Sequence, residues 1–328
     1  MPSSLADGYD CVVFDCDGVL WSGGETIAGA FATLDALERA GKKVYFMSNN
    51  SSRGLAEFRR VFEAHGLGRF VRDDARVWNS LTAARHWFEE RGGGGAAYVV
   101  GAPALKAGVA AAGVRVVEPE PKRGAAPDEL ADMAIDPGVD SVVLGFDKNY
   151  GYFEVAYAVR CVLENGAKLV VTNRDFQFPA QRGLKMPGNG AFVAAVCAAA
   201  RKEPDAVVAK PEPYVLRKII EDAGCAPSRV LMVGDMWSDV VFAHGAGADA
   251  ALVLSGVATA ADGDAWTGAM APDYVVADLT RLLDPAPPAA ARRLKRALAK
   301  LGAALPWSHV ACVAAGVAIA ALVGRRRS

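Results

Sequence analysis

The sequence is poor in histidine, and its cysteines form no close pairs. Four isolated histidines in 328 residues argue against a histidine-based zinc site and against a Ser-His-Asp triad. None of the six cysteines forms a pair at metal-ligand or redox spacing, which fits a reducing compartment without a disulfide framework. A formal net charge of −1 gives no electrostatic footprint for nucleic acid. Residues 1–10 lack the apolar core of a signal peptide, so none is expected.

What the chain does contain is an alternation of apolar strand patterns and amphipathic helix patterns. Residues 1–91 give strand, helix, strand, helix, which is typical of a parallel sheet with covering helices. Four glycines then begin a fresh α/β pattern over residues 92–190, and the first pattern resumes over residues 191–284. We therefore predict an α/β fold with a Rossmann-like parallel-sheet core in two parts, 1–91 and 191–284, interrupted by an inserted α/β domain at 92–190.

The C-terminal section has a different composition. Residues 285–300 read as a Pro/Ala linker and a basic, helix-prone segment. Residues 301–324 contain no Asp, Glu, Lys or Arg. As a helix they would span about 36 Å, more than the roughly 30 Å of a membrane's hydrocarbon core. We predict that residues 301–328 are a C-terminal apolar helix that anchors the protein in a membrane. A terminal helix packed on the domain is the alternative.

Two carboxylates follow the first apolar strand pattern. Residues 11–14 run into Asp15 and Asp17, and a glycine comes next. Because residues i and i+2 of a strand point to the same side, the two carboxylates would face one spot beyond the strand. Their repulsion would be relieved by a divalent cation or by a proton shared with a substrate. Considered alone, the stretch could equally be an Asp-rich turn.

Polar side chains follow three further apolar strand patterns. They are Ser48 with Asn49 and Asn50, then Lys210, then Asp235 with Asp239. Ligands of open parallel sheets bind beyond the carboxyl ends of the strands, so these groups should meet Asp15 and Asp17 there. Together they supply what phosphoryl transfer requires: a nucleophile, an acid, Mg²⁺ ligands and a cation for the phosphate oxygens.

In this order, the motifs resemble those of the haloacid dehalogenase (HAD) superfamily of phosphatases. The four motifs are Phe14-Asp15-Cys16-Asp17-Gly18-Val19-Leu20-Trp21, Ser48 at a strand end, Lys210, and Gly234-Asp235-Met236-Trp237-Ser238-Asp239. The similarity is closest to the large-cap (class IIA) branch, which includes 4-nitrophenyl phosphatases, phosphoglycolate phosphatases and pyridoxal phosphate phosphatases.

Shorter matches to the branch support the resemblance, which covers roughly residues 9–278. They are Ser48-Asn49-Asn50-Ser51, Gly145-Phe146-Asp147, Thr172-Asn173-Arg174-Asp175, Pro187-Gly188-Asn189-Gly190 and Lys210-Pro211-Glu212-Pro213-Tyr214. One feature departs from the branch. Three residues separate Asp235 from Asp239, where the branch often has four, so the role of Asp239 is less defined.

The resemblance implies the chemistry at the strand ends. Asp15 would attack phosphorus and become a phosphoaspartate. Asp17 would protonate the leaving oxygen and then activate water. The cofactor would be Mg²⁺, bound by the carboxylates of Asp15 and Asp235 and by the main-chain carbonyl of Asp17.

It also implies how the phosphoryl group and the rest of the substrate are bound. Ser48, Asn49, Asn50 and Lys210 would bind the phosphoryl oxygens, and Asp239 would orient Lys210 or a metal-bound water. The inserted domain would act as a cap, with Asn173, Arg174, Asp175 and Phe178 near the leaving group. Arg174 could instead form a salt bridge within the cap, and Phe178 could belong to the cap core. Caps of this type often pair, which allows a homodimer.

The predicted function is Mg²⁺-dependent hydrolysis of small-molecule phosphate monoesters such as phosphoglycolate or 4-nitrophenyl phosphate. Alternatives are a pyridoxal phosphate phosphatase of the same branch and a non-catalytic, membrane-tethered phosphate-binding protein. A receiver-type phospho-acceptor domain would be much shorter and does not need the acid Asp17. A metal-dependent glycosyltransferase with an Asp-x-Asp pair would leave Lys210 and Asp235 unexplained.

The apolar C-terminal run makes one prediction testable without any structure. Deleting residues 306–328 should abolish membrane association, since the charge-free segment would be lost. The expected membrane is mitochondrial, plastid or peroxisomal, with the catalytic part facing the cytosol; a cytoplasmic protein is the alternative. Fractionation of the full-length and truncated proteins checks this. A full-length protein that stays with the cytosol without detergent would refute the anchor.

Overall fold

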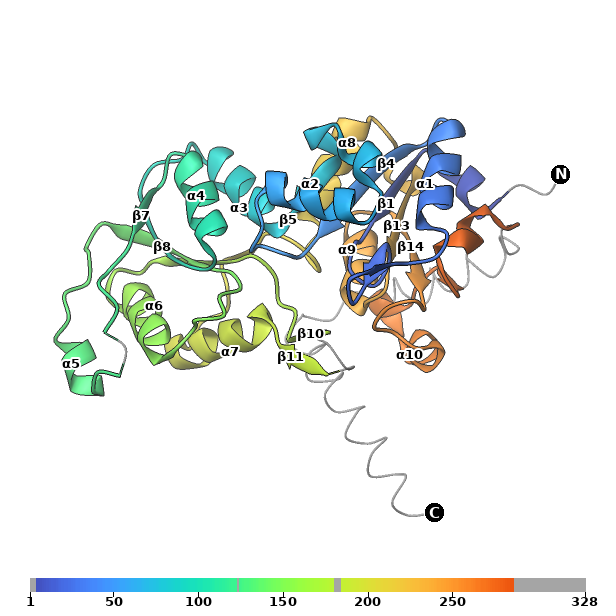
Figure 1. Cartoon of the computed structure of the whole chain (residues 1–328). Coiled ribbons are helices and arrows are strands. Elements are labelled where there is room, and N and C mark those ends of the chain that lie inside the picture. The colour runs from blue at the N-terminus through green and yellow to red at the C-terminus, as the bar shows by residue number, and fades with distance from the viewer. Residues whose placement is uncertain (1–3, 123, 180–183, 286–328) are drawn as a thin grey trace, which may run out of the picture.

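Two parallel sheets lie side by side in the computed structural model, which describes residues 4–122, 124–179 and 184–285 (Figure 1). The six-stranded sheet has the order β15 (Tyr274–Val276), β14 (Asp249–Val253), β13 (Val230–Gly234), β1 (Cys11–Phe14), β4 (Lys43–Ser48) and β5 (Val77–Asn79). The five-stranded sheet has the order β12 (Ala206–Val207), β9 (Lys168–Val171), β8 (Val139–Leu144), β6 (Ala96–Val100) and β7 (Arg115–Val117). The predicted Rossmann-like parallel core is confirmed.

Helices and two hairpins complete the described chain. The hairpins pair β2 (Trp21–Ser22) with β3 (Glu25–Thr26), and β10 (Gln177–Pro179) with β11 (Lys185–Pro187). The α-helices are α1 (Ala30–Arg39), α2 (Leu55–Ala64), α3 (Ser80–Glu89), α4 (Pro103–Ala111), α5 (Pro127–Ala131), α6 (Tyr152–Glu164), α7 (Asn189–Ala200), α8 (Tyr214–Ala223), α9 (Trp237–Gly245) and α10 (Ala260–Ala265).

Strand β1 is apolar throughout because both faces of the six-stranded sheet are covered. Val12 and Phe14 belong to a core that includes residues of α1 and α2. Cys11 and Val13 face the opposite core, to which α8 and α9 contribute. Neighbouring strands β4 and β13 pair with β1 in parallel register, so all three end at the same edge of the sheet.

The two sheets share one of these cores. The apolar cluster that contains Met47 of β4 continues through Trp87 of α3 to Leu105 of α4 and Val143 of β8. On its other face, the five-stranded sheet packs against α6 and α7. Continuous close packing across the junction therefore connects the sheet that carries the strand-end carboxylates to the second sheet.

The strand near residue 206 does not lie where the sequence pattern placed it. It was expected in the resumed core pattern, but β12 pairs with β9 of the five-stranded sheet, and α7 packs on that sheet as well. Main-chain bonds from Asp205 N to Leu169 O (2.8 Å) and from Val208 N to Val171 O (3.0 Å) flank the pairing. We propose that the inserted section extends through β12 rather than ending at residue 190.

The predicted membrane anchor, residues 301–328, lies outside the described residues, as does the linker from residue 286 onward. A search of the described helices finds none with the length and apolar character needed to span a bilayer. Attachment to a membrane stays a prediction from the sequence.

Candidate active site

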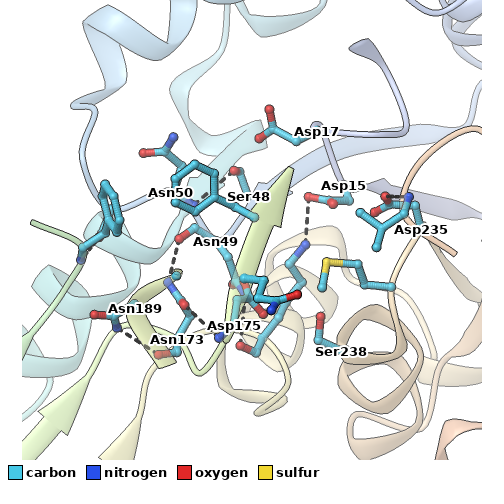
Figure 2. Close-up of a pocket in the computed structure, with 18 of the residues that line it drawn as sticks. Asp15, Asp17, Ser48, Asn49, Asn50, Asn173, Asp175, Asn189, Asp235 and Ser238 are labelled. Carbon is cyan, nitrogen blue, oxygen red and sulfur yellow. Dashed lines mark hydrogen bonds and ion pairs between the residues drawn. The ribbon is translucent and has the colours of Figure 1, made fainter. Parts of the chain in front are cut away.

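A pocket of about 250 Å³ opens where the carboxyl ends of β1, β4 and β13 meet segments of the second sheet. Figure 2 shows Asp15, Ser48 and Asp235 reaching it from these three strand ends. From the second sheet come Asn173 and Asp175, which follow β9. The lining includes the predicted residues Asp15, Asp17, Ser48, Asn49, Asn50, Asn173, Asp175, Phe178, Lys210 and Asp235.

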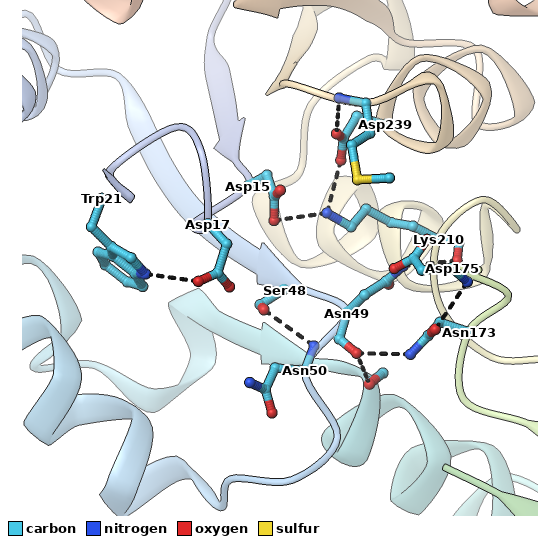
Figure 3. Close-up of polar contacts among 12 residues, drawn as sticks. Asp15, Asp17, Trp21, Ser48, Asn49, Asn50, Asn173, Asp175, Lys210 and Asp239 are labelled. Carbon is cyan, nitrogen blue, oxygen red and sulfur yellow. Dashed lines mark hydrogen bonds and ion pairs between the residues drawn. The ribbon is translucent and has the colours of Figure 1, made fainter. Parts of the chain in front are cut away.

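Lys210 lies between two buried carboxylates (Figure 3). Its Nζ is 2.8 Å from Asp15 Oδ1 and 2.8 Å from Asp239 Oδ1, and all three side chains are less than 10% exposed. Burial alone would lower the pKa of Lys210, but the carboxylates of Asp15 and Asp239 outweigh this and raise it. Lys210 is therefore held as a cation against the predicted nucleophile.

Asp239 also has a local structural role. Its Oδ2 accepts a hydrogen bond from Met236 N (3.0 Å) at the N-terminus of α9, where a carboxylate is favoured. Because its two oxygens contact Met236 and Lys210, Asp239 orients the lysine. The resemblance allows either Lys210 or a metal-bound water as its partner, and the structure shows the contact with Lys210.

Three carboxylates gather against this single ammonium group. Ligand oxygens of Asp15, Asp235 and Asp239 all lie within 4.8 Å of one another. Burial raises the pKa of Asp15 well above its ordinary value, although Lys210 opposes the shift. Burial, reinforced by Asp239, raises the pKa of Asp235 to about 7. Fully ionised, the three carboxylates would carry more negative charge than one lysine compensates, and the raised pKa values reflect that cost.

Asp235 has the free ligand atom that a cation would require. Its Oδ2 accepts a hydrogen bond from Val257 N (2.7 Å), whereas its buried Oδ1 has no partner among the described residues. A buried, unpaired carboxylate oxygen is costly unless a cation or a proton compensates it. Since oxygen ligands suit Mg²⁺, the donor set of Asp15 and Asp235 fits that ion. The carboxylate of Asp17 lies outside this buried cluster.

Two glycines allow loops to approach Asp235 closely. A Cβ on Gly18, whose φ is +84°, would lie 2.2 Å from Asp235 Oδ2, and one on Gly256 would lie 1.9 Å from it. Side chains at these positions would collide with the carboxylate. The Asp-Gly step of the first motif therefore has a steric reason besides its turn conformation.

Asn49 connects the strand end to the second sheet. Its side-chain Nδ2 donates to Asp175 Oδ2 (2.8 Å) and to Lys210 O (3.1 Å). Its main-chain oxygen accepts from Asn173 Nδ2 (2.9 Å) and from Ser80 Oγ (2.7 Å). Because the side-chain amide is engaged in this way, phosphate binding by Asn49 would fall to its main-chain N–H.

Ser48 and Asn50 lie beside Asn49 in the pocket wall. Ser48 Oγ, which is almost fully buried, accepts a hydrogen bond from Asn50 N (3.2 Å). Asn50 Oδ1 accepts from both N and Oγ of Ser52, at 2.9 and 2.7 Å, and so forms a local turn. The loop after β4 is therefore held by its own side chains.

Arg174 does not line the pocket. Its guanidinium forms an ion pair with Glu203 (2.8 Å) on the surface of the second sheet. This arrangement matches the alternative in which Arg174 forms a salt bridge. Its neighbour Asp175, and not Arg174, lines the pocket where the leaving group is expected. Burial raises the pKa of Asp175 to about 6, against the hydrogen bond from Asn49. Its buried Oδ1 has no partner among the described residues.

Sequence reasoning missed several pocket residues. They are Ser51, Ser52, Phe146, Gly188, Asn189, Met236, Ser238 and Val257, whereas Gln177 belongs to the stretch 173–178 that was expected near the leaving group. Phe146 lies edge-on to Phe178 at 5.4 Å between ring centroids. Phe146 and Asn189 stand in the short motifs Gly145-Phe146-Asp147 and Pro187-Gly188-Asn189-Gly190, which would have been the signal for them. Met236 and Ser238 stand within the fourth motif, whereas Val257 lies in no motif and carries no polar group in its side chain.

Known proteins are similar to this chain in sequence and in fold. A family model for haloacid dehalogenase-like hydrolases matches residues 12–115, and a second one, HAD-hydrolase-like, matches residues 207–282. The glycerol-3-phosphate phosphatase of Gallus gallus is 36% identical over 84% of this chain and 91% of its own length. Chronophin of Homo sapiens is 35% identical over 83% of this chain and 93% of its own.

Solved structures agree with the sequence comparison. A 4-nitrophenylphosphatase from Thermotoga maritima superimposes with a TM-score of 0.72 at 28% identity, over 85% of this chain and 98% of its own. A glycerol phosphate phosphatase from Mycobacterium tuberculosis in complex with magnesium gives 0.72 at 29% identity, over 87% and 79%. The chain therefore belongs to the haloacid dehalogenase-like hydrolases, in the large-cap (class IIA) phosphatase branch. Within that family it is a phosphoric monoester hydrolase.

The close approach of Gly18 to Asp235 yields a test of the proposed metal ligand. Gly18→Ala should displace the Asp235 carboxylate and weaken Mg²⁺ binding about tenfold or more, as changes beside metal ligands commonly do. Isothermal titration with Mg²⁺ measures this directly, without an activity assay. Gly24→Ala is the matched control, since Gly24 has a similar φ of +93° but no atom near the added Cβ. Equal Mg²⁺ affinities in the two variants would contradict the placement of the ion at Asp235.

Proposed function

We propose that the protein hydrolyses small phosphate monoesters with Mg²⁺ as cofactor, through a phosphoaspartate formed on Asp15. The observation that carries the proposal is the position of Asp15 at the base of the pocket. Its carboxylate lies 2.8 Å from Lys210 and within 4.8 Å of a carboxylate oxygen of Asp235, a residue whose buried Oδ1 has no partner among the described residues. Asp15, Asp235 and the main-chain carbonyl of Asp17 would hold Mg²⁺. When bound, the ion offsets the repulsion between an anionic nucleophile and a phosphate dianion.

The reaction proceeds in two steps. Asp15 attacks phosphorus, and an Asp15–phosphorus bond forms as the bond to the leaving oxygen breaks. Asp17 gives its proton to that leaving oxygen. Asp17 then takes a proton from water, whose oxygen attacks the phosphoaspartate and releases inorganic phosphate. Lys210, Ser48 and the main-chain N–H of Asn49 stabilise the charge on the phosphoryl oxygens.

The lining of the pocket bears on which leaving group is accepted. Lys210 is the single cationic side chain among the described lining residues, and Asp15 and Asp239 already engage it. The cap side presents amides and the Asp175 carboxylate instead. A second anion, such as the carboxylate of phosphoglycolate, would meet no free cation among the described lining residues. We therefore favour a neutral, hydroxyl-bearing leaving group, as in glycerol phosphate, over phosphoglycolate.

An aromatic leaving group is the second candidate. The rings of Phe146 and Phe178 both line the pocket, and Phe178 is 39% exposed. An exposed ring can pack against the ring of 4-nitrophenyl phosphate or pyridoxal phosphate. Pairing of two caps and attachment to a membrane remain predictions from the sequence.

The nucleophile assignment predicts a complete loss of turnover in Asp15→Asn protein, because an amide cannot attack phosphorus. EDTA should abolish wild-type hydrolysis of 4-nitrophenyl phosphate, and added Mg²⁺ should restore it. Asp10→Asn is the matched control, since Asp10 stands at the opposite, amino end of β1 in an exposed ion pair with Arg229. Hydrolysis that survives in Asp15→Asn would refute the mechanism.

A long-lived phosphoenzyme in wild type that Asp17→Asn does not prolong would instead favour a receiver-type acceptor.

The charge of Asp175 predicts a substrate preference. At pH 7.5 the wild type should prefer glycerol 3-phosphate to phosphoglycolate in kcat/KM. Asp175→Asn should shift the ratio toward phosphoglycolate by about tenfold, because one like charge near the substrate is worth at least roughly 1 kcal/mol. Arg174→Gln should leave the ratio unchanged, since Arg174 pairs with Glu203 outside the pocket. A ratio that responds to Arg174→Gln and not to Asp175→Asn would reverse the two assignments.

A further inference from the structure

Trp21 contacts the carboxylate that would transfer the proton. Its indole Nε1 donates a hydrogen bond to Asp17 Oδ1 at 3.0 Å (Figure 3). The chain between them forms a tight turn, closed by a bond from Gly18 N to Trp21 O (2.7 Å). Trp21 is 4% exposed, whereas Asp17 is exposed. A rigid, buried donor therefore holds one oxygen of a carboxylate that is otherwise open to solvent.

The indole ring is itself fixed from several sides. His65 stacks on it with ring centroids 4.8 Å apart and an interplanar angle of 8°. Phe62 of α2 meets it edge-on at 4.9 Å. The His65 ring also contacts the β2–β3 hairpin to which Trp21 belongs. Its Nδ1 lies 3.0 Å from Oγ1 of Thr26, the residue that pairs with Trp21 across the hairpin. The direction of the N–H is thus set by close packing rather than by the loop alone.

An exposed carboxylate without such a donor would sample several rotamers. Each rotamer that turns it from the pocket removes the proton donor from the reacting oxygen, and small misplacements of a catalytic group are costly in rate. One oxygen of Asp17 accepts from Trp21, so the other is left to carry the proton.

We propose that Trp21 is a positioning residue for proton transfer by Asp17. This inference rests on the proposed function, which assigns to Asp17 the protonation of the leaving oxygen. Trp21 does not touch the substrate in this scheme. It holds Asp17 Oδ1, so that the proton on Oδ2 passes to the leaving oxygen as the phosphorus–oxygen bond breaks and is regained from water in the second step.

The choice of leaving group separates positioning from general structural support. An alkyl phosphate such as glycerol 3-phosphate expels a basic alkoxide, which needs the proton. The leaving group of 4-nitrophenyl phosphate is a stable phenolate and needs it far less. Trp21→Phe keeps an aromatic ring but removes the N–H. We expect kcat/KM for glycerol 3-phosphate, which reports the first step alone, to fall about tenfold or more, a part of the 10²–10⁴ that acid–base catalysis typically supplies. The value of kcat/KM for 4-nitrophenyl phosphate should change little, because its first step needs no proton donor.

Trp78→Phe is the matched control. Trp78 is also buried, but its Nε1 has no hydrogen-bond partner among the described residues, so the same substitution removes an N–H that contacts no acceptor there. Site-specific 3-benzothienylalanine at position 21, which replaces the N–H by sulfur at similar shape, serves as a second variant should Trp21→Phe fold poorly. In an Asp17→Asn background, Trp21→Phe should cause no further loss for glycerol 3-phosphate.

The outcomes are distinct. A selective loss for the alkyl phosphate that disappears in the Asp17→Asn background supports the inference. An equal loss for both substrates, or no loss, overturns it while hydrolysis by the wild type leaves the proposed function intact. A wild type that hydrolyses neither ester overturns the proposed function and this inference with it.

Discussion

The ion pair of Lys210 with Asp15 and Asp239 determines how the rest of the site is arranged. All three side chains are buried, and removing one member of such a group typically costs about 3–5 kcal/mol. Lys210 follows β12 of the five-stranded sheet, whereas Asp15 follows β1 of the six-stranded sheet and Asp239 lies in α9, which packs on that sheet. The contact therefore requires the two sheets to be held in one relative position. The shared apolar core between them supplies that position.

Asn49 adds a second link at the same junction. It bonds the main chain of Lys210 and the side chain of Asp175, while its own main-chain oxygen accepts from Asn173. The group that would bind phosphate and the groups that would meet the leaving group are thus connected through one residue. A displacement of Asn173 or Asp175 would therefore change the position of Asn49 at the end of β4.

Much of this site could be predicted from the sequence, because its signal is local. Asp15, Ser48 and Asp235 each stand directly after, or at the end of, a buried apolar strand, and parallel strands place such residues at one edge. The rest depends on contacts between distant segments. Whether Arg174 faces substrate or Glu203 is decided by the path of the chain after β9. The two residues of β12 are too few to show any periodicity, so their sheet could not be assigned. The C-terminal anchor concerns residues beyond the described chain.

The two sheets supply different parts of the pocket, and this arrangement has an evolutionary consequence. The nucleophile and the carboxylate with the unpaired oxygen follow strands of the six-stranded sheet, whereas Asp175, Gln177 and Phe178 belong to the segment after β9. Under the proposed function, substitutions of Gln177 or Phe178 would change which ester is accepted and leave the ion pairs of Lys210 with Asp15 and Asp239 in place. Lys210 limits which substitutions the inserted section tolerates, since it follows β12 of that section and forms an ion pair with Asp15. Duplicated copies of such a gene could diverge in substrate range while keeping a single catalytic apparatus.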